Sequence, residues 1–221
     1  MLCFAALMIY GGYRVWDIYQ DYKAESNMHA AVLEYKPQGN DVVNQSVVDL
    51  QAKYPDVAGW LTVPGTGIDY PFVQGKDNDY YLRRNLNGDY ALAGTLFMDC
   101  RCDKEFSSQN TILYGHHLKN GSMFGALKFF ADQGFFDANQ NGTIFLPRET
   151  ISLEFFAYLV VKSGDETIYS TEFGEDYFGY VKQNARQYRD IGLADGDKLV
   201  TLSTCSYEFS NARMVLLARA K

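Results

Sequence analysis

The spacing of apolar residues changes near position 54 and divides the chain into two parts. Before it, residues 16–35 mix charged residues with spaced apolar ones and contain no proline or glycine, which predicts a helix. The sequence PQGN at 37–40 ends this pattern, and a second short helix is predicted over residues 44–53. We therefore expect a helical stalk or brace over residues 17–53 and a separate domain over residues 54–221.

The second part consists of short apolar runs separated by turn residues, a pattern typical of strands. The strand-like runs are WLTV, IDYPFVQ, GTLFMD, NTILYGH, TIFL, ISLEFFAYLVVKS, KLVTLSTC and RMVLLARA. Two predicted helices interrupt them, GSMFGALKFF at 121–130 and an amphipathic segment over 175–190. Many short strands with few helices between them favour a mostly antiparallel barrel or sandwich.

The first thirteen residues, MLCFAALMIYGGY, carry no charge, and Arg14 is the first charged residue. This run is shorter than the roughly 20 residues that span a bilayer as a helix. It also lacks a basic segment before it and a small-residue cleavage site after it. We expect an uncleaved signal-anchor over residues 1–16, for which a truncated start is one explanation. The prediction is a cell-membrane protein with the domain over residues 54–221 on the extracellular face, and the alternative is a buried core helix.

Composition and charge narrow the class of protein. The 221 residues are 47% hydrophobic and 21% charged, which is ordinary for a globular protein with a packed core. The formal net charge is −7, whereas a nucleic-acid-binding surface needs a basic footprint. We therefore expect no nucleic-acid partner.

The four cysteines, Cys3, Cys100, Cys102 and Cys205, do not make a disulfide framework. Cys100 and Cys102 lie two positions apart, too close for an unstrained bridge in extended chain. Together with a histidine pair they suggest zinc, but zinc sites usually have wider cysteine spacing and four ligands. We expect no metal ion and no cofactor, and the role of Cys100 and Cys102 stays open.

The three histidines differ in their setting. His29 lies in the predicted stalk helix, where we expect a solvated side chain. His116 and His117 directly follow a strand-like run, and strand ends place functional groups on a rigid scaffold. Position alone leaves a functional and a structural role for this pair equally open.

Cys205 also ends a strand-like run, between Thr204 and Ser206. A free cysteine is commonly buried and inert, and this alternative stays open beside a nucleophilic role. Arg213 follows eight positions later, so a hairpin-like loop would place the two residues opposite each other on adjacent antiparallel strands. A guanidinium there would favour the thiolate or stabilise an oxyanion, whereas an ordinary surface arginine is the alternative.

Three motifs in the order histidine, cysteine, arginine carry a family resemblance. They are YGHH with His116 after the glycine, VTLSTC over 200–205 with its final cysteine, and ARMVLLAR with Arg213. The sequence resembles the sortases, most closely class B sortases, from about Tyr54 to its end. GTLFMD, GSMF and the helical segment over 175–190 also look like class B sequence.

The resemblance implies a closed eight-stranded β-barrel with an N-terminal helical extension and a helix inserted before the penultimate strand. It implies a monomeric cysteine transpeptidase that acts on the C-terminal sorting signal of exported proteins. The implied second partner is an amine acceptor, either a peptidoglycan precursor or a pilin lysine. The exact sorting motif stays open.

The resemblance also implies roles for five residues. Cys205 would attack the carbonyl after a threonine and form a thioacyl-enzyme. His116 would protonate the leaving amine and deprotonate the incoming one, without lying within hydrogen-bond distance of the thiol in the resting enzyme. Arg213 would position the substrate and stabilise the oxyanion, and Ser203 and Thr204 would line the substrate groove. The role of His117 stays open, because adjacent residues on a strand point to opposite faces.

Two alternatives compete with this interpretation. One is another cell-wall cysteine peptidase or transpeptidase. A papain-like peptidase places its cysteine before its histidine, and the cysteine of an L,D-transpeptidase usually follows a glycine, where this chain has Thr204. The other alternative is a non-catalytic surface binding domain.

Overall fold

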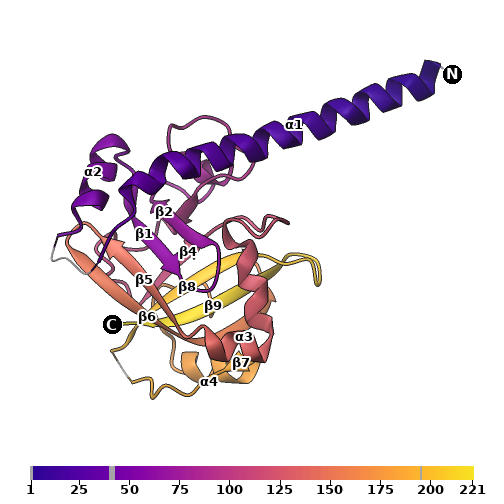
Figure 1. Cartoon of the computed structure of the whole chain (residues 1–221). Coiled ribbons are helices and arrows are strands. Elements are labelled where there is room, and N and C mark those ends of the chain that lie inside the picture. The colour runs from indigo at the N-terminus through magenta and orange to yellow at the C-terminus, as the bar shows by residue number, and fades with distance from the viewer. Residues whose placement is uncertain (1, 40–42, 195) are drawn as a thin grey trace.

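A closed β-barrel forms the centre of the molecule (Figure 1). The computed structural model describes residues 2–39, 43–194 and 196–221. Nine strands of the described residues form one sheet in the order β5-β1-β2-β3-β4-β8-β9-β6-β7, and an additional pairing of β5 with β6 closes it. Eight strands therefore make the barrel, and β7 lies outside it along β6.

The strands follow the apolar runs of the sequence. They are β1 Val57–Val63, β2 Ile68–Val73, β3 Leu96–Met98, β4 Asn110–Tyr114, β5 Asn141–Leu146, β6 Glu149–Lys162, β7 Gln187–Tyr188, β8 Lys198–Cys205 and β9 Ala212–Ala220. Only the pairs β2–β3 and β4–β8 are parallel among the pairings of the described residues. The predicted closed barrel, mostly antiparallel and with an N-terminal helical extension, is confirmed.

The helices cover the ends and one side of the barrel. They are α1 Leu2–Val32, α2 Gln45–Lys53, α3 Gln133–Ala138 and α4 Tyr177–Asn184, with the 3-10 helices η1 Leu33–Tyr35, η2 Tyr80–Arg83 and η3 Phe124–Ala131. The helix predicted over 121–130 is therefore the 3-10 helix η3. The division of the chain at residues 16, 17, 53 and 54 stays a prediction.

The helix before β8 is shorter than the 16-residue segment 175–190 that the apolar spacing predicts. It ends at Asn184, and the backbone then runs along the edge of β6. Arg186 N donates to Tyr158 O at 2.8 Å and Arg189 N donates to Phe156 O at 2.7 Å. Backbone carbonyls at the edge of β6 thus accept hydrogen bonds from these two amides. In a longer helix the same amides would donate to carbonyls of the helix itself.

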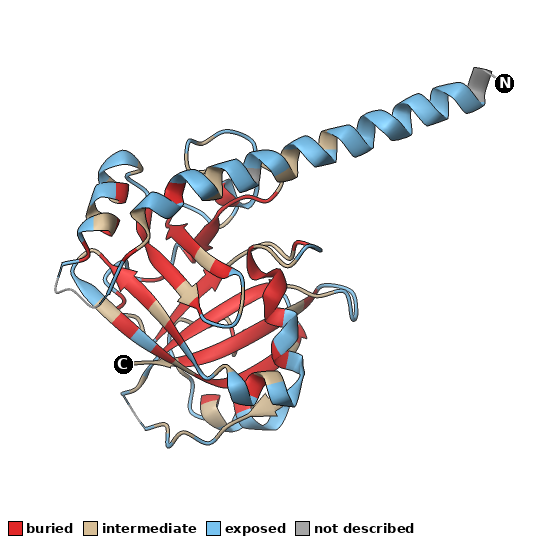
Figure 2. Ribbon diagram, viewed as in Figure 1, coloured by how far each residue is buried: buried red, intermediate tan, exposed pale blue. Residues whose placement is uncertain are grey.

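Buried apolar side chains fill the barrel, as the red strands of Figure 2 show. A second cluster lies between α4 and the outer face of β6, β8 and β9. A third lies under α2, where Val47 and Leu50 are fully buried. Asn44 precedes this helix and donates through Nδ2 to Leu146 O at 2.7 Å and Glu149 O at 3.1 Å, which ties α2 to the β5–β6 turn.

The expected membrane anchor over residues 1–16, and with it the cell-membrane location, is contradicted. Helix α1 does not stop at residue 16 but continues as one helix of 31 residues. The uncharged stretch gives way to Arg14 and Asp17, which form an ion pair at 3.3 Å. Among the described residues, no helix combines the length and the apolar character that crossing a bilayer demands.

Replacing Leu50 with alanine tests the contribution of α2 to stability. The side chain is fully buried, so we expect Leu50→Ala to lower the free energy of unfolding by about 2–5 kcal/mol. Chemical denaturation followed by fluorescence measures the change. Asp49→Ala, an exposed position of the same helix, is the control and should change stability by less than about 0.5 kcal/mol. Equal effects of the two variants would show that α2 does not depend on its buried face.

Candidate active site

Cys205 and Arg213 lie opposite each other on adjacent strands. Cys205 is the last residue of β8, and the antiparallel register pairs it with Arg213, the second residue of β9. The predicted hairpin-like arrangement is confirmed. Arg213 Nη1 donates to Ala212 O at 3.0 Å.

The parallel pairing of β4 with β8 brings the histidine motif to the same end of the barrel. Tyr114 is in register with Ser203, and Gly115 N donates to Ser203 O at 3.1 Å. Thr204 Oγ1 in turn donates to Gly115 O at 2.6 Å. His116, the next residue, therefore follows β4 where β8 reaches Cys205.

A glycine is needed between Tyr114 and His116. A Cβ atom at Gly115 would lie 2.4 Å from Leu96 Cδ2 and 2.8 Å from the ring of Phe124. Real Cβ atoms do not approach so closely, so any other residue would push the histidine turn away from β8. The glycine of YGH is thus a packing requirement.

One pocket of about 210 Å³ joins the predicted residues. It is lined by Cys205, His116, Arg213, Ser203 and Thr204, and by Asn78, Leu82, Phe97, Tyr114, Gly115, Ser163 and Tyr169. The hydroxyl of Ser203 hydrogen-bonds to Tyr169 Oη at 2.8 Å, and that of Thr204 is bound to Gly115 O. Both hydroxyls therefore fix the wall of the pocket.

The two histidines contact different backbone carbonyls. His116 Nε2 lies 2.6 Å from Leu82 O, and His117 Nδ1 lies 2.9 Å from Cys205 O. Because a carbonyl oxygen only accepts, Nε2 of His116 and Nδ1 of His117 carry the protons. The basic nitrogen is then Nδ1 in His116 and Nε2 in His117.

Burial lowers the pKa of both imidazoles. For His116, burial outweighs the opposing hydrogen bond to Leu82 O, and the charge of Arg83 lowers the pKa further. For His117, burial again exceeds the effect of the bond to Cys205 O, with help from Lys128. Both rings are therefore predominantly neutral at pH 7, as a general base requires.

His29 is not the solvated helix residue that the sequence predicts. Its ring stacks on Tyr70 of β2 with a centroid distance of 4.2 Å, and Nε2 donates to Asp69 O at 2.9 Å. The sequence offers no signal for this contact, because residue 29 and residue 69 meet only in the folded chain.

The sequence did not predict the buried carboxylate of Asp99, which holds two residues of the pocket wall. Asp99 is fully buried and accepts from Arg101 Nε at 2.9 Å, Arg101 Nη2 at 2.8 Å and Tyr114 Oη at 2.9 Å. Burial raises the pKa of Asp99, but these hydrogen bonds outweigh it and leave the pKa below its ordinary value. Arg101 Nη2 also donates to Tyr169 O at 3.0 Å. The ion pair thus holds two tyrosines, Tyr114 and Tyr169, that line the pocket.

Cys100 and Cys102 lie in different surroundings. Cys100 is exposed, whereas Cys102 is buried and its sulfur accepts from Ile112 N at 3.4 Å. Burial raises the pKa of Cys102 to about 11, so this thiol is unreactive at neutral pH. Within the part of the chain that the structure describes, no three His, Cys, Asp or Glu side chains gather as a metal site would need.

A model of the sortase domain matches residues 61–221. The chain belongs to the sortase family. It is 38% identical to sortase B of Listeria monocytogenes over 185 residues, which cover 80% of this chain and 74% of that protein. The crystal structure of sortase B from Bacillus anthracis superposes with a TM-score of 0.81 and 32% identity, over 91% of this chain and 98% of that one.

A class B sortase of Streptococcus pyogenes, described as involved in pilus biogenesis, is 30% identical with a TM-score of 0.74. The match covers 79% of this chain and 97% of the streptococcal chain. The predicted class is therefore confirmed. This sortase is a class B member and a cell-wall cysteine transpeptidase, and its family implies sorting-signal substrates and amine acceptors.

The lowered pKa values predict how this sortase responds to pH. Because both pKa values lie below 6.5, the unfolded chain binds more protons than the native protein between each lowered pKa and 6.5. The stability that the neutral rings contribute is complete above pH 6.5 and is lost as the pH falls through each lowered pKa. We expect the ring protons of His116 and His117 to titrate below pH 6.5 in NMR spectra.

The variants His116→Gln and His117→Gln assign the two resonances. A titration midpoint at or above pH 6.5 for either ring would contradict the buried, neutral state.

Proposed function

We propose that Cys205 is the nucleophile of this sortase. Its sulfur attacks the carbonyl carbon of a threonine in the sorting signal, and the C–N bond to the next residue breaks. The product is a thioester between Cys205 and the new C-terminus of the exported protein. The observation that supports this role is the single pocket that Cys205 shares with His116 and Arg213.

His116 is the proposed acid and base. Protonated by the proton that the Cys205 thiol loses, it gives this proton to the leaving amine as the thioester forms. Neutral, it takes a proton from the incoming amine, which attacks the thioester and releases Cys205. A lowered pKa suits the second task, and Nδ1 is the nitrogen that the bond to Leu82 O leaves basic.

Arg213 is proposed to stabilise the oxyanion of the tetrahedral intermediates and to position the substrate. Its place opposite Cys205 in the register supports this role. Ser203 and Thr204 are proposed to line the substrate groove. Their hydroxyls already bind Tyr169 and Gly115, so they act as a fixed surface.

The substrate is a protein with a C-terminal sorting signal, cleaved after threonine. The acceptor is an amine, and two sources fit the chemistry, namely a peptidoglycan precursor and a pilin lysine. The streptococcal relative is described as involved in pilus biogenesis, which supports a pilin lysine as one candidate acceptor. We propose that one chain is sufficient for the reaction, and gel filtration of the active enzyme tests this.

Substitutions in the pocket test the assignment. Cys205→Ala should abolish cleavage of a sorting-signal peptide, because no nucleophile remains. His116→Ala should lower kcat by roughly 10²–10⁴-fold. Arg213→Ala should lower kcat by about 10²–10³-fold, and Arg213→Lys by less, because it keeps the charge but not the planar donors. Mass spectrometry of the peptide products and of the thioacyl-enzyme measures each step.

One control lies on β9, the strand of Arg213, and the other lies just after β3. Arg219→Ala removes an arginine from the far end of β9, where it pairs with Glu154, and Cys100→Ala removes an exposed thiol. Both should keep the parent kcat. If folded Cys205→Ala protein still cleaves the peptide, or if Arg219→Ala is as impaired as Arg213→Ala, the assignment fails.

A further inference from the structure

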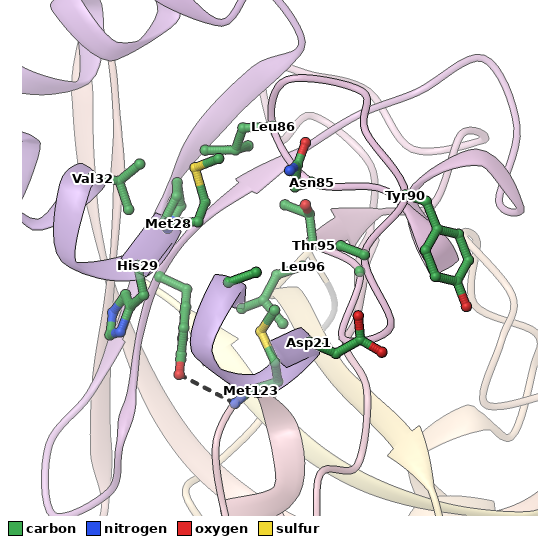
Figure 3. A pocket seen from close by; sticks show the side chains of 15 residues that line it. Asp21, Met28, His29, Val32, Asn85, Leu86, Tyr90, Thr95, Leu96 and Met123 are labelled. Atoms are coloured by element: carbon green, nitrogen blue, oxygen red, sulfur yellow. Dashed lines mark hydrogen bonds between the residues drawn. The ribbon is translucent and has the colours of Figure 1, made fainter. Parts of the chain in front are cut away.

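A second pocket, of about 80 Å³, lies between α1 and the barrel. Figure 3 shows Met28 and Val32 of α1 facing Leu86, Leu96 and Met123 across it. Leu96 is the side chain that a Cβ at position 115 would strike, and Met123 directly precedes Phe124, the other side chain in that contact. The N-terminal helix therefore packs against the back of the histidine turn.

Two contacts attach this helical extension to β2. His29 stacks on Tyr70 and binds Asp69 O, as described above. Lys36, which follows η1, forms an ion pair with Asp69 Oδ2 at 2.6 Å. Both contacts stabilise the same interface, but they act on different residues: the His29 ring stacks on Tyr70, whereas Lys36 pairs with the carboxylate of Asp69.

Tyr70 in turn holds the return segment of the histidine turn. Met123 N donates to Tyr70 Oη at 3.3 Å, the dashed line in Figure 3. Met123 has φ +52° and ψ −129°, a backbone conformation that favours glycine and is strained for methionine. Such a conformation persists only where its surroundings enforce it, and the hydroxyl of Tyr70 is one such restraint.

The restrained residue is joined to the proposed acid and base. Met123 pairs with His117 in an isolated antiparallel bridge, and Phe124 N donates to His116 O at 3.0 Å. The chain of contacts from α1 to the active site is therefore His29, Tyr70, Met123 and then the backbone of residues 116–117. Each link is a ring contact or a hydrogen bond between described residues.

We propose that His29 and Tyr70 are positioning residues for His116, and that the N-terminal helix is a working part of the active site. His29 fixes the ring of Tyr70, and the Tyr70 hydroxyl fixes the strained turn that carries the imidazole. The inference rests on the proposed role of His116. His29, Tyr70 and Met123 are not among the residues that line the pocket of Cys205.

The test compares four variants of the full chain. Tyr70→Phe removes only the hydroxyl, and His29→Ala removes the stacked ring. We expect each to lower kcat by roughly 10-fold while KM stays within about twofold, because misplacing a catalytic group slows the chemical steps. His29→Phe keeps a stacked ring and should restore most of the parent kcat. Lys36→Ala loosens the same interface by removing the ion pair with Asp69, leaves the His29–Tyr70 stack in place and should keep the parent kcat.

Amide hydrogen exchange reports on the turn without any substrate. Tyr70→Phe and His29→Ala should speed exchange over residues 116–125, and Lys36→Ala should not. If Lys36→Ala lowers kcat as much as His29→Ala, or if Tyr70→Phe leaves both kcat and exchange unchanged, the proposal is overturned. If the parent enzyme cleaves no sorting peptide, the proposed function is refuted. The exchange measurements would still test separately whether His29 and Tyr70 hold the turn over residues 116–125.

Discussion

The parallel pairing of β4 with β8 is the contact on which the rest of the active centre depends. Gly115 and Thr204, which extend it, are 89 positions apart in the sequence and joined by a 2.6 Å hydrogen bond. Because the two strands run in the same direction, both deliver their C-terminal residues to one rim of the barrel. A shift of one residue would turn every side chain of one strand to the other face and would separate the imidazole from the thiol. The missing Cβ at Gly115 makes this close approach sterically allowed.

Buried polar groups fix the loops around that rim. Asn110, fully buried at the start of β4, donates through Nδ2 to Ile168 O and Ser170 O and accepts from Thr201 Oγ1. Asp99 and its arginine partner hold the same loop through Tyr169 O. Removing the Asn110 side chain would leave Thr201 Oγ1 and Ile168 O unpaired in a low-dielectric interior, which costs more than the bonds themselves contribute. The shape of the pocket is therefore enforced by hydrogen-bond satisfaction as well as by apolar packing.

The sequence contained enough information for the barrel and for the opposition of Cys205 and Arg213. Strand periodicity and turn residues are local signals, and a hairpin between two marked ends has few alternative registers. The errors arose where the deciding contact is distant in sequence. The segment after Asn184 joins the edge of β6, His29 meets β2, and Arg101, the partner of Asp99, reaches Tyr169 O across 68 positions. At the N-terminus the error had a different source, because the uncharged run and the charged helix after it were assigned to two elements, whereas α1 joins them in one helix.

The turn between β8 and β9 combines a fixed strand register at its two ends with exposed residues at its tip. Eight consecutive pairs fix the register up to Cys205 and Arg213, and Ser206 N closes the turn on Ala212 O at 2.9 Å. Asn211, with φ +60°, makes the reversal, while residues 207–210 are exposed. Those exposed positions can change in sequence without moving the thiol or the guanidinium. The register of the two strands, and not the sequence of the turn, therefore holds the thiol opposite the guanidinium.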